Sequence, residues 1–184
     1  MTVALSLVTL NSADRAAFVD DLGRVYEHSP WVAEQAWLER PFRSVEALCA
    51  AMQRAVKKAD REAQLELIRA HPELAGKLAI AGKLTADSRT EQASAGLDRC
   101  TPEEFEQFQA LNDAYRRKFG FPFIVAVRGL TRGEVLARLR QRVANSAEGE
   151  FETCMQEIGR IARFRLDDLI KEHDISANQQ ESRT

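Results

Sequence analysis

The sequence has few of the residues that build metal centres and disulfide frameworks. It contains three cysteines and three histidines in 184 residues, and no two cysteines form a CxxC pair. An odd number of widely spaced cysteines excludes a disulfide framework and is typical of a reducing compartment. His28, His71 and His173 lie far apart, without the spacing of metal ligands, so we expect no metal site.

An excess of charge of one sign is also missing. Lys and Arg number 26 against 28 Asp and Glu, which gives a net charge of -2, so we expect neither nucleic acid nor a membrane surface as a partner. No apolar run approaches the length of a membrane span. The N-terminal "MTVALSLVTL" has no basic leader, and the final "SRT" does not match the peroxisomal tripeptide. We therefore expect a cytoplasmic protein.

The remaining composition is that of a globular domain, because 45% of the residues are hydrophobic and 29% are charged. Apolar residues recur three and four positions apart along most of the chain, which indicates amphipathic helices. We predict an all-α fold, a single-domain bundle of roughly seven to eight helices given typical helix lengths. The domain is expected to cover residues 1–175, followed by a flexible polar tail over residues 176–184.

The clearest helix start lies at Thr101, where Pro102 occupies the first position and Glu104 completes a capping box. Gly120 is the expected end of that helix. The following "GFPFIVAVRG" is apolar but short. It fits a buried strand, a buried extended loop or a helical turn, and periodicity does not separate these.

His71 stands directly before a proline, which pushes it out of helical geometry and ends the preceding helix near Ala70. An imidazole at a helix junction can point into a cleft, and histidine suits proton transfer near neutral pH. The alternative is a capping residue in an ordinary helix break.

A second candidate is the polar segment "TADSRTEQASAGL", in which Asp87 or Ser88 is expected to cap a short helix. Ser88, Glu91 and Gln92 are three and four positions apart, so they share one face. A hydroxyl, a carboxylate and an amide on one face suit a small polar ring as ligand. A solvated helix is the alternative reading.

Arg165 is the third candidate, because it lies seven positions after Ile158 and so on the same apolar side of its helix. A guanidinium on a buried side needs an anion. That anion is either the carboxylate of a substrate or a structural carboxylate at the edge of the core.

The stretches "WLERPF", "HPELAGK", "LTADSRTEQASAGLD", "LNDAYRRKFGFPFIVAVRG" and "EIGRIARFRLDDL" together resemble one family, the 2-oxo-4-hydroxy-4-carboxy-5-ureidoimidazoline (OHCU) decarboxylases. They stand in the family's order and cover most of the chain from Trp37 to Leu169. The resemblance implies an all-α homodimer that removes CO2 from OHCU and forms (S)-allantoin without a cofactor, in the breakdown of urate.

The resemblance also implies roles for particular residues. His71 and Glu91 match the family's catalytic residues, and Arg165 matches the arginine that orients the substrate, although Phe164 replaces the family's usual leucine before it. The other positions that match residues lining the substrate site are Pro72, Ser88, Gln92, Phe121, Ile124 and Val125.

Two other functions remain open at this point. One is a non-catalytic helical binding module, and the other is a hydrolase of a related ureide that uses His71 and Glu91 to activate water. The sequence also leaves open which of these two residues moves which proton.

Overall fold

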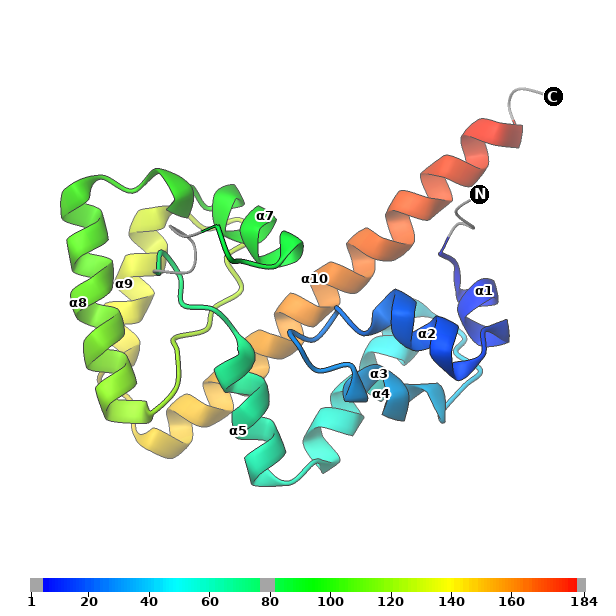
Figure 1. Cartoon of the computed structure of the whole chain (residues 1–184), viewed down its shortest axis with the longest axis horizontal. Helices are drawn as coiled ribbons and strands as arrows, with labels where there is room; N and C mark the ends of the chain where they lie inside the picture. Colours follow the sequence, from blue (N-terminus) through cyan, green and yellow to red (C-terminus); the bar gives the residue numbers. More distant parts are fainter. Residues whose placement is uncertain (1–4, 77–81, 182–184) are drawn as a thin grey trace. The chain divides into compact units, whose positions relative to one another are not determined.

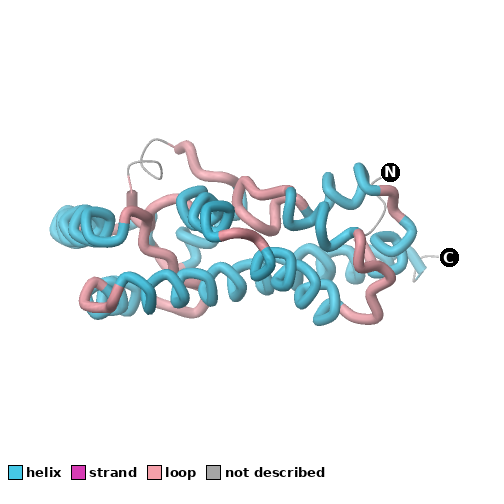
Figure 2. The backbone as a smooth tube through the Cα atoms, turned by 90° about the horizontal axis from the view of Figure 1, so that it is seen from below, coloured by secondary structure: helices cyan, strands magenta, loops and turns pink. Residues whose placement is uncertain are grey.

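The computed structural model describes the backbone of residues 5–76 and 82–181, with side chains through Ile170. This part of the chain forms nine α-helices and one short 3-10 helix, and it contains no strand (Figures 1 and 2). Eight of the α-helices have seven or more residues. The predicted all-α class and the predicted number of helices are therefore confirmed.

The chain divides into two compact units. The first comprises the N-terminal residues through Leu67 together with the chain from Gly159 onward, and the second comprises Ile68–Ile158. Helices α5 and α10 contribute residues to both units. The extent of the predicted domain, residues 1–175, stays a prediction.

The first unit is built from five helices of the N-terminal part of the chain and the later part of the long helix α10. They are α1 (Leu7–Ser12), α2 (Arg15–Leu22), α3 (Trp31–Trp37), α4 (Val45–Lys58), most of α5 (Arg61–Ala70) and the later part of α10 (Ala147–Glu181). Helix α3 contacts both α2 and α4. The largest side chains buried there are apolar: Leu10, Phe18, Leu22, Leu48, Met52 and Leu67.

Polar caps set the helix starts in this unit. The Ser44 side chain accepts a hydrogen bond from the backbone N–H of Ala47 at 3.1 Å, and Asp60 accepts one from Ala63 at 2.8 Å. These side chains satisfy first-turn N–H groups that have no partner within the helix. The starts of α4 and α5 thus follow from local sequence.

The second unit contains the end of α5, α7 (Ala86–Ser94), the 3-10 helix η1 (Leu97–Arg99), α8 (Pro102–Phe119), α9 (Arg132–Arg142) and the beginning of α10. Helices α8 and α9 lie side by side (Figure 1). The capping box of Thr101 and Glu104 starts α8, and Gly120 ends it at a φ of +77°, as predicted. The fully buried side chains of the second unit include Phe108, Tyr115, Phe123, Leu139 and Ile158.

The apolar segment after Gly120 has no regular secondary structure. Residues 121–125 are all buried, yet they form an extended loop that pairs with no strand of the described chain. Of the three structures that the sequence allowed, the structure has the buried extended loop.

At the C-terminal end, the backbone of α10 continues to Glu181. Residues 176–181 are thus helical in the segment expected to be a flexible tail, and the flexibility of that segment stays a prediction. Within the described chain, no helix combines the length and the apolar character needed to cross a membrane.

Candidate active site

His71 lies immediately after the last residue of α5, Ala70, as the proline at position 72 predicts. Its backbone N–H still donates to the carbonyl of Ile68 at 3.2 Å, and the residue is only 7% exposed. The predicted helix break is therefore confirmed, and the imidazole is buried at that break. His71 also has at least one further interaction of its own within the chain.

The imidazole borders a pocket of about 500 Å³, which we call the His71 pocket. All of its lining residues belong to the second unit: Arg69, His71, Pro72, Glu73, Arg116, Gly120, Phe121 and Pro122. The structure thus brings together three residues from the sequence analysis, His71, Pro72 and Phe121.

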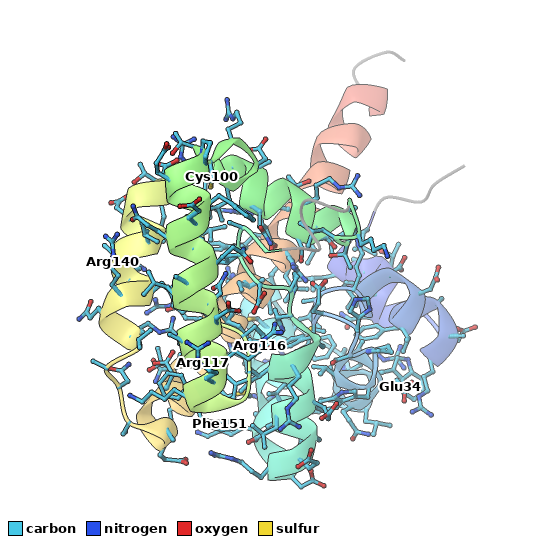
Figure 3. All side chains as sticks on the ribbon, turned by 60° about the vertical axis from the view of Figure 1, so that its left-hand side comes forward. Glu34, Cys100, Arg116, Arg117, Arg140 and Phe151 are labelled. Carbon is cyan, nitrogen blue, oxygen red and sulfur yellow. The ribbon has the colours of Figure 1, made fainter. Side chains whose placement is uncertain are left out.

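The charges around this pocket are mainly positive. Arg116 of α8, labelled in Figure 3, pairs with Glu73 at 2.5 Å between Nη2 and Oε1. Arg69 contributes a second guanidinium to the lining. Two guanidinium groups against one carboxylate favour an anionic ligand, and the proline and phenylalanine side chains supply rigid apolar walls.

Helix α7 carries the second group of candidates, but its cap differs from the prediction. Thr85 is the N-cap, because its side chain accepts from the backbone N–H of Ser88 at 3.3 Å. The expectation that Asp87 or Ser88 caps the helix is wrong, because the helix already begins at Ala86 and both residues lie within its first turn. Ser88 and Gln92 are buried, whereas Glu91 is half-buried, so this face is not the solvated face of the alternative reading.

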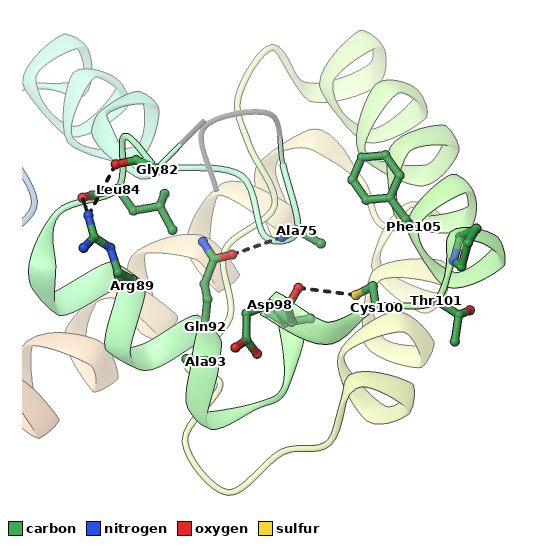
Figure 4. A pocket seen from close by; sticks show the side chains of 12 residues that line it. Ala75, Gly82, Leu84, Arg89, Gln92, Ala93, Asp98, Cys100, Thr101 and Phe105 are labelled. Atoms are coloured by element: carbon green, nitrogen blue, oxygen red, sulfur yellow. Dashed lines mark hydrogen bonds between the residues drawn. The ribbon is translucent and has the colours of Figure 1, made fainter. Parts of the chain in front are cut away.

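The Gln92 side chain holds the loop that follows His71. Its Oε1 accepts from the backbone N–H of Ala75 at 3.1 Å, and its Nε2 donates to the carbonyl of Glu73 at 3.3 Å. Gln92 also borders a second cavity of about 940 Å³, shown in Figure 4. That cavity is lined further by Leu84, Arg89, Leu97, Asp98, Cys100, Thr101, Pro102 and Phe105.

The extended segment with Ile124 and Val125 is fixed through its backbone. Arg142 donates from Nη1 to the carbonyl of Ile124 at 2.5 Å, and Glu157 accepts from the N–H of Ala126 at 2.8 Å. Two charged side chains of α9 and α10 thereby replace the strand partner that this segment lacks.

A buried network stands behind that contact. Glu150, which is fully buried, accepts from Nε of Arg142 at 2.8 Å, from Nδ2 of Asn145 at 2.7 Å and from the hydroxyl of Tyr115. Burial, and then the neighbouring Cys154, raise the pKa of Tyr115. Burial also raises the pKa of the Cys154 thiol, so both groups stay protonated beside the Glu150–Arg142 pair.

Arg165 belongs to the first unit, and a carboxylate of the chain already contacts it. Its Nη1 donates to Oε2 of Glu27 at 2.9 Å and to the carbonyl of Arg24 at 3.3 Å. Of the two anions that the sequence allows for Arg165, the structure shows the structural carboxylate, which is that of Glu27. Contact of Arg165 with substrate, and its convergence with His71 and Glu91 in one cleft, stay predictions.

Among the described residues, no three His, Cys, Asp or Glu side chains are grouped so that they could hold a metal ion.

Known protein families provide a comparison that does not depend on this geometry. Residues 11–167 match the OHCU decarboxylase family. The chain belongs to the OHCU decarboxylase family. The match includes all the candidate residues named above, from His71 to Arg165.

Two relatives in the OHCU decarboxylase family match this chain over nearly their whole length. The 2-oxo-4-hydroxy-4-carboxy-5-ureidoimidazoline decarboxylase of Halalkalicoccus jeotgali is 45% identical over 95% of this chain and 97% of its own. The protein of the same name from Mus musculus is 36% identical over 94% of this chain and 97% of its own. The uric acid degradation bifunctional protein PucL of Bacillus subtilis is 44% identical, but this chain covers only 32% of its length.

Solved structures have the same fold. A crystal structure of (S)-allantoin synthase superposes with a TM-score of 0.71 at 34% identity, covering 90% of this chain and 54% of that one. An OHCU decarboxylase crystallised in the presence of (S)-allantoin gives a TM-score of 0.68 over 82% of this chain and 98% of its own. Because the second structure is only 23% identical to this chain, the similarity indicates a shared fold and not a shared activity.

Sequence reasoning missed polar residues that support the segments of the candidate site rather than line its pockets. Glu27, Asn112, Arg142 and Glu157 are all buried and polar. A signal existed for Asn112, which lies four positions after Phe108 and three before Tyr115 and so shares their buried face. For the others, the buried partner is distant in sequence, and no local pattern indicates it.

Proposed function

We propose that this chain decarboxylates OHCU to (S)-allantoin in urate breakdown and needs no cofactor to do so. The observation that carries the proposal is the position of His71, a buried imidazole at a helix break that borders a cationic pocket. The family membership and the names of the relatives support the same reaction. OHCU is an anion of small size, which suits a pocket of about 500 Å³.

The reaction needs orientation and proton transfer more than it needs an external electron acceptor. OHCU carries a carboxylate and a hydroxyl on one ring carbon, beside a carbon that is doubly bonded to nitrogen. When the bond to the carboxylate breaks, CO2 leaves and its electron pair forms a new double bond between the two ring carbons, while the ring nitrogen takes a proton. Addition of a proton to the ureido-bearing carbon and loss of the hydroxyl proton then give allantoin.

The residues of the site match these tasks. His71 is the main acid or base, because imidazole exchanges protons near neutral pH, and Glu91 is the second proton-handling group. The order of their proton transfers stays open. Arg165 orients the substrate carboxylate by paired hydrogen bonds, and Ser88 and Gln92 present polar groups to the ring.

The extended segment supplies the remaining contacts in this proposal. Backbone groups near Phe121, Ile124 and Val125 bind the ring, while Pro72 forms part of the wall. Because Arg142 and Glu157 hold this segment in place, its other backbone groups are oriented before the substrate arrives. A site that binds the ring on one side delivers the final proton to one face and so yields one enantiomer.

The test is an optical assay on freshly made substrate. OHCU is generated from urate by the two upstream enzymes, the protein is added, and circular dichroism is followed in the near ultraviolet. We expect rapid appearance of a persistent (S)-allantoin signal, whereas unaided decay gives racemic allantoin without a lasting signal. Decay at the unaided rate from a folded sample would overturn the proposal, and product formation without release of CO2 would indicate the hydrolase instead.

Variants assign the roles within the same assay. His71→Ala and Glu91→Gln are expected to abolish turnover while the circular dichroism of the helices stays unchanged. The matched control for Glu91→Gln is Glu106→Gln, because Glu106 is exposed on α8. Normal turnover in His71→Ala would remove His71 from the mechanism.

Quaternary structure and location belong to the same proposal. We expect a homodimer, which sedimentation equilibrium tests directly, and a cytoplasmic enzyme whose partner is the small-molecule substrate. A monomer at all accessible concentrations would contradict the first expectation.

A further inference from the structure

The three residues that follow His71 and Pro72 are held by amide side chains from two helices. Besides the two bonds from Gln92 of α7, Gln109 of α8 donates from Nε2 to the carbonyl of Ala75 at 2.9 Å. Asn112, one turn further along α8, donates from Nδ2 to the carbonyl of Leu74 at 3.0 Å. Successive carbonyls of residues 73–75 are thus each bound by a side chain that lies 19 to 38 positions away.

The backbone of this loop is strained at Ala75. Its φ is +49°, in the left-handed region, which costs an L-residue with a side chain about 1–2 kcal/mol. Such a conformation persists only where its surroundings determine it. Here both the N–H and the carbonyl of Ala75 are fixed by side chains, those of Gln92 and Gln109.

Asn112 has a cost of its own. The residue is 3% exposed, and its Oδ1 has no hydrogen-bond partner among the described residues. The amide cannot be turned around, because the carbonyl of Leu74 accepts and so requires the nitrogen on that side. A buried acceptor without a partner costs about 1–3 kcal/mol, so the hydrogen bond to the carbonyl of Leu74 is the contact that favours an asparagine here.

The loop is also tied on its outer side. The Glu73 carboxylate pairs with Arg116, and the His71 N–H is bound to Ile68 at the end of α5. Between these two fixed points stands Pro72, whose ring restricts its own φ. The loop of residues 73–75 is therefore joined to His71 by a single residue of restricted backbone freedom.

We propose that Gln109 and Asn112 are positioning residues, which hold the loop of residues 73–75 and thereby set the direction of the His71 imidazole. This inference rests on the proposed function, in which His71 transfers a proton. Catalytic groups must be placed closely, and a displacement of about 1 Å costs roughly 100-fold in rate. The loss of either bond should therefore lower kcat far more than it changes KM.

The experiment uses isosteric variants of the full chain. Asn112→Leu and Gln109→Met remove one donor each at nearly constant volume, and we expect kcat to fall by about 10- to 100-fold with KM nearly unchanged. The matched control is Gln107→Met on the same helix, where Gln107 accepts a hydrogen bond from Arg140 and not from the loop. Gln109→Lys restores a donor at similar reach and should recover most of the lost activity.

A second readout separates positioning from general damage. The chain has three histidines, so an NMR spectrum contains few imidazole signals. The signal of His71 is assigned by its absence from the spectrum of His71→Ala. In Asn112→Leu and Gln109→Met the His71 signal should move while the His28 signal does not, and in Gln107→Met neither should move. This readout needs no turnover.

The outcomes distinguish this inference from the proposed function. If the wild-type chain does not decarboxylate OHCU, the proposed function fails, and the His71 signal still tests whether the loop of residues 73–75 sets the surroundings of the imidazole. If Asn112→Leu does not fold, Gln109→Met and Gln109→Lys carry the test. An unchanged kcat, a change in KM alone, no recovery in Gln109→Lys, or an unmoved His71 signal overturns the inference.

Discussion

Arg165 and Glu27, 138 positions apart in sequence, form an ion pair of 2.9 Å in which the two side chains are 4% and 2% exposed. Taking two charges out of water is costly, and each of them depends on the other for compensation. The pair also directs one edge of the guanidinium toward Glu27. Glu27 therefore restricts the direction in which the Arg165 guanidinium points.

The first prediction concerns the stability of this pair. Glu27→Gln leaves the Arg165 charge buried without its counterion, so we expect the free energy of unfolding to fall by about 3–5 kcal/mol. Urea unfolding at pH 7 measures the change. The control is Glu34→Gln at the exposed pair with Arg15, where the side chains are 55% and 40% exposed and the loss should stay below about 1 kcal/mol. Equal losses in the two variants would contradict a special cost of the buried pair.

The second prediction concerns the role of Arg165 in binding. Arg165→Lys keeps the positive charge toward Glu27 but cannot form two parallel hydrogen bonds to a carboxylate. We expect KM for OHCU to rise about tenfold, the loss of roughly 1.4 kcal/mol of binding, with a smaller change in kcat. Steady-state kinetics in the optical assay measure both constants, and an unchanged KM would remove the substrate-orienting role.

The third prediction concerns stability at alkaline pH. Burial raises the pKa of Tyr115 and of Cys154 in the folded chain, whereas unfolded tyrosine and cysteine ionise near about 10 and 8.5. The stabilisation is therefore fully present below about pH 8.5 and is lost as the pH rises, because only the unfolded chain releases these protons. Each such group lowers the free energy of unfolding by about 1.4 kcal/mol per pH unit above its unfolded pKa.

Urea unfolding at several pH values between neutrality and pH 10 measures the part of this slope that comes from cysteine, since unfolded tyrosine ionises only near about pH 10. Cys154→Ala removes one of the groups and should make the alkaline slope shallower, whatever its effect on stability at pH 7. Cys100→Ala should change the slope less, because Cys100 is only half-buried. Identical slopes in the two variants would show that the buried thiol does not contribute.

The fourth prediction tests the strain at Ala75. Glycine adopts a positive φ without penalty, and this gain offsets the greater freedom of glycine in the unfolded chain. We expect Ala75→Gly to leave the melting temperature nearly unchanged, whereas Ala50→Gly within α4 should cost about 1 kcal/mol. Thermal unfolding measures both, and a loss at Ala75 as large as that at Ala50 would mean that its left-handed backbone is not strained.

Local sequence determined much of the fold. The capping box of Thr101 and Glu104, the left-handed end of α8 at Gly120 and the helix break before Pro72 all stand where the sequence predicts them. Each depends on groups within a few positions of one another, which is why a linear pattern reveals it. The predicted cap of α7 is wrong because Thr85, Asp87 and Ser88 can all cap a helix. Which of them does so depends on the conformation of the loop before the helix.

The sequence by itself determined the all-α class, the family and the identity of the candidate residues His71, Glu91 and Arg165. Only the tertiary structure decided which side chains hold the loop after His71 and the segment after Gly120. The partners there, Gln109 with Ala75 and Arg142 with Ile124, are 34 and 18 positions apart. Helix periodicity relates residues three and four positions apart, whereas such bonds depend on how separate helices pack, and only the folded chain brings the two groups within 3 Å.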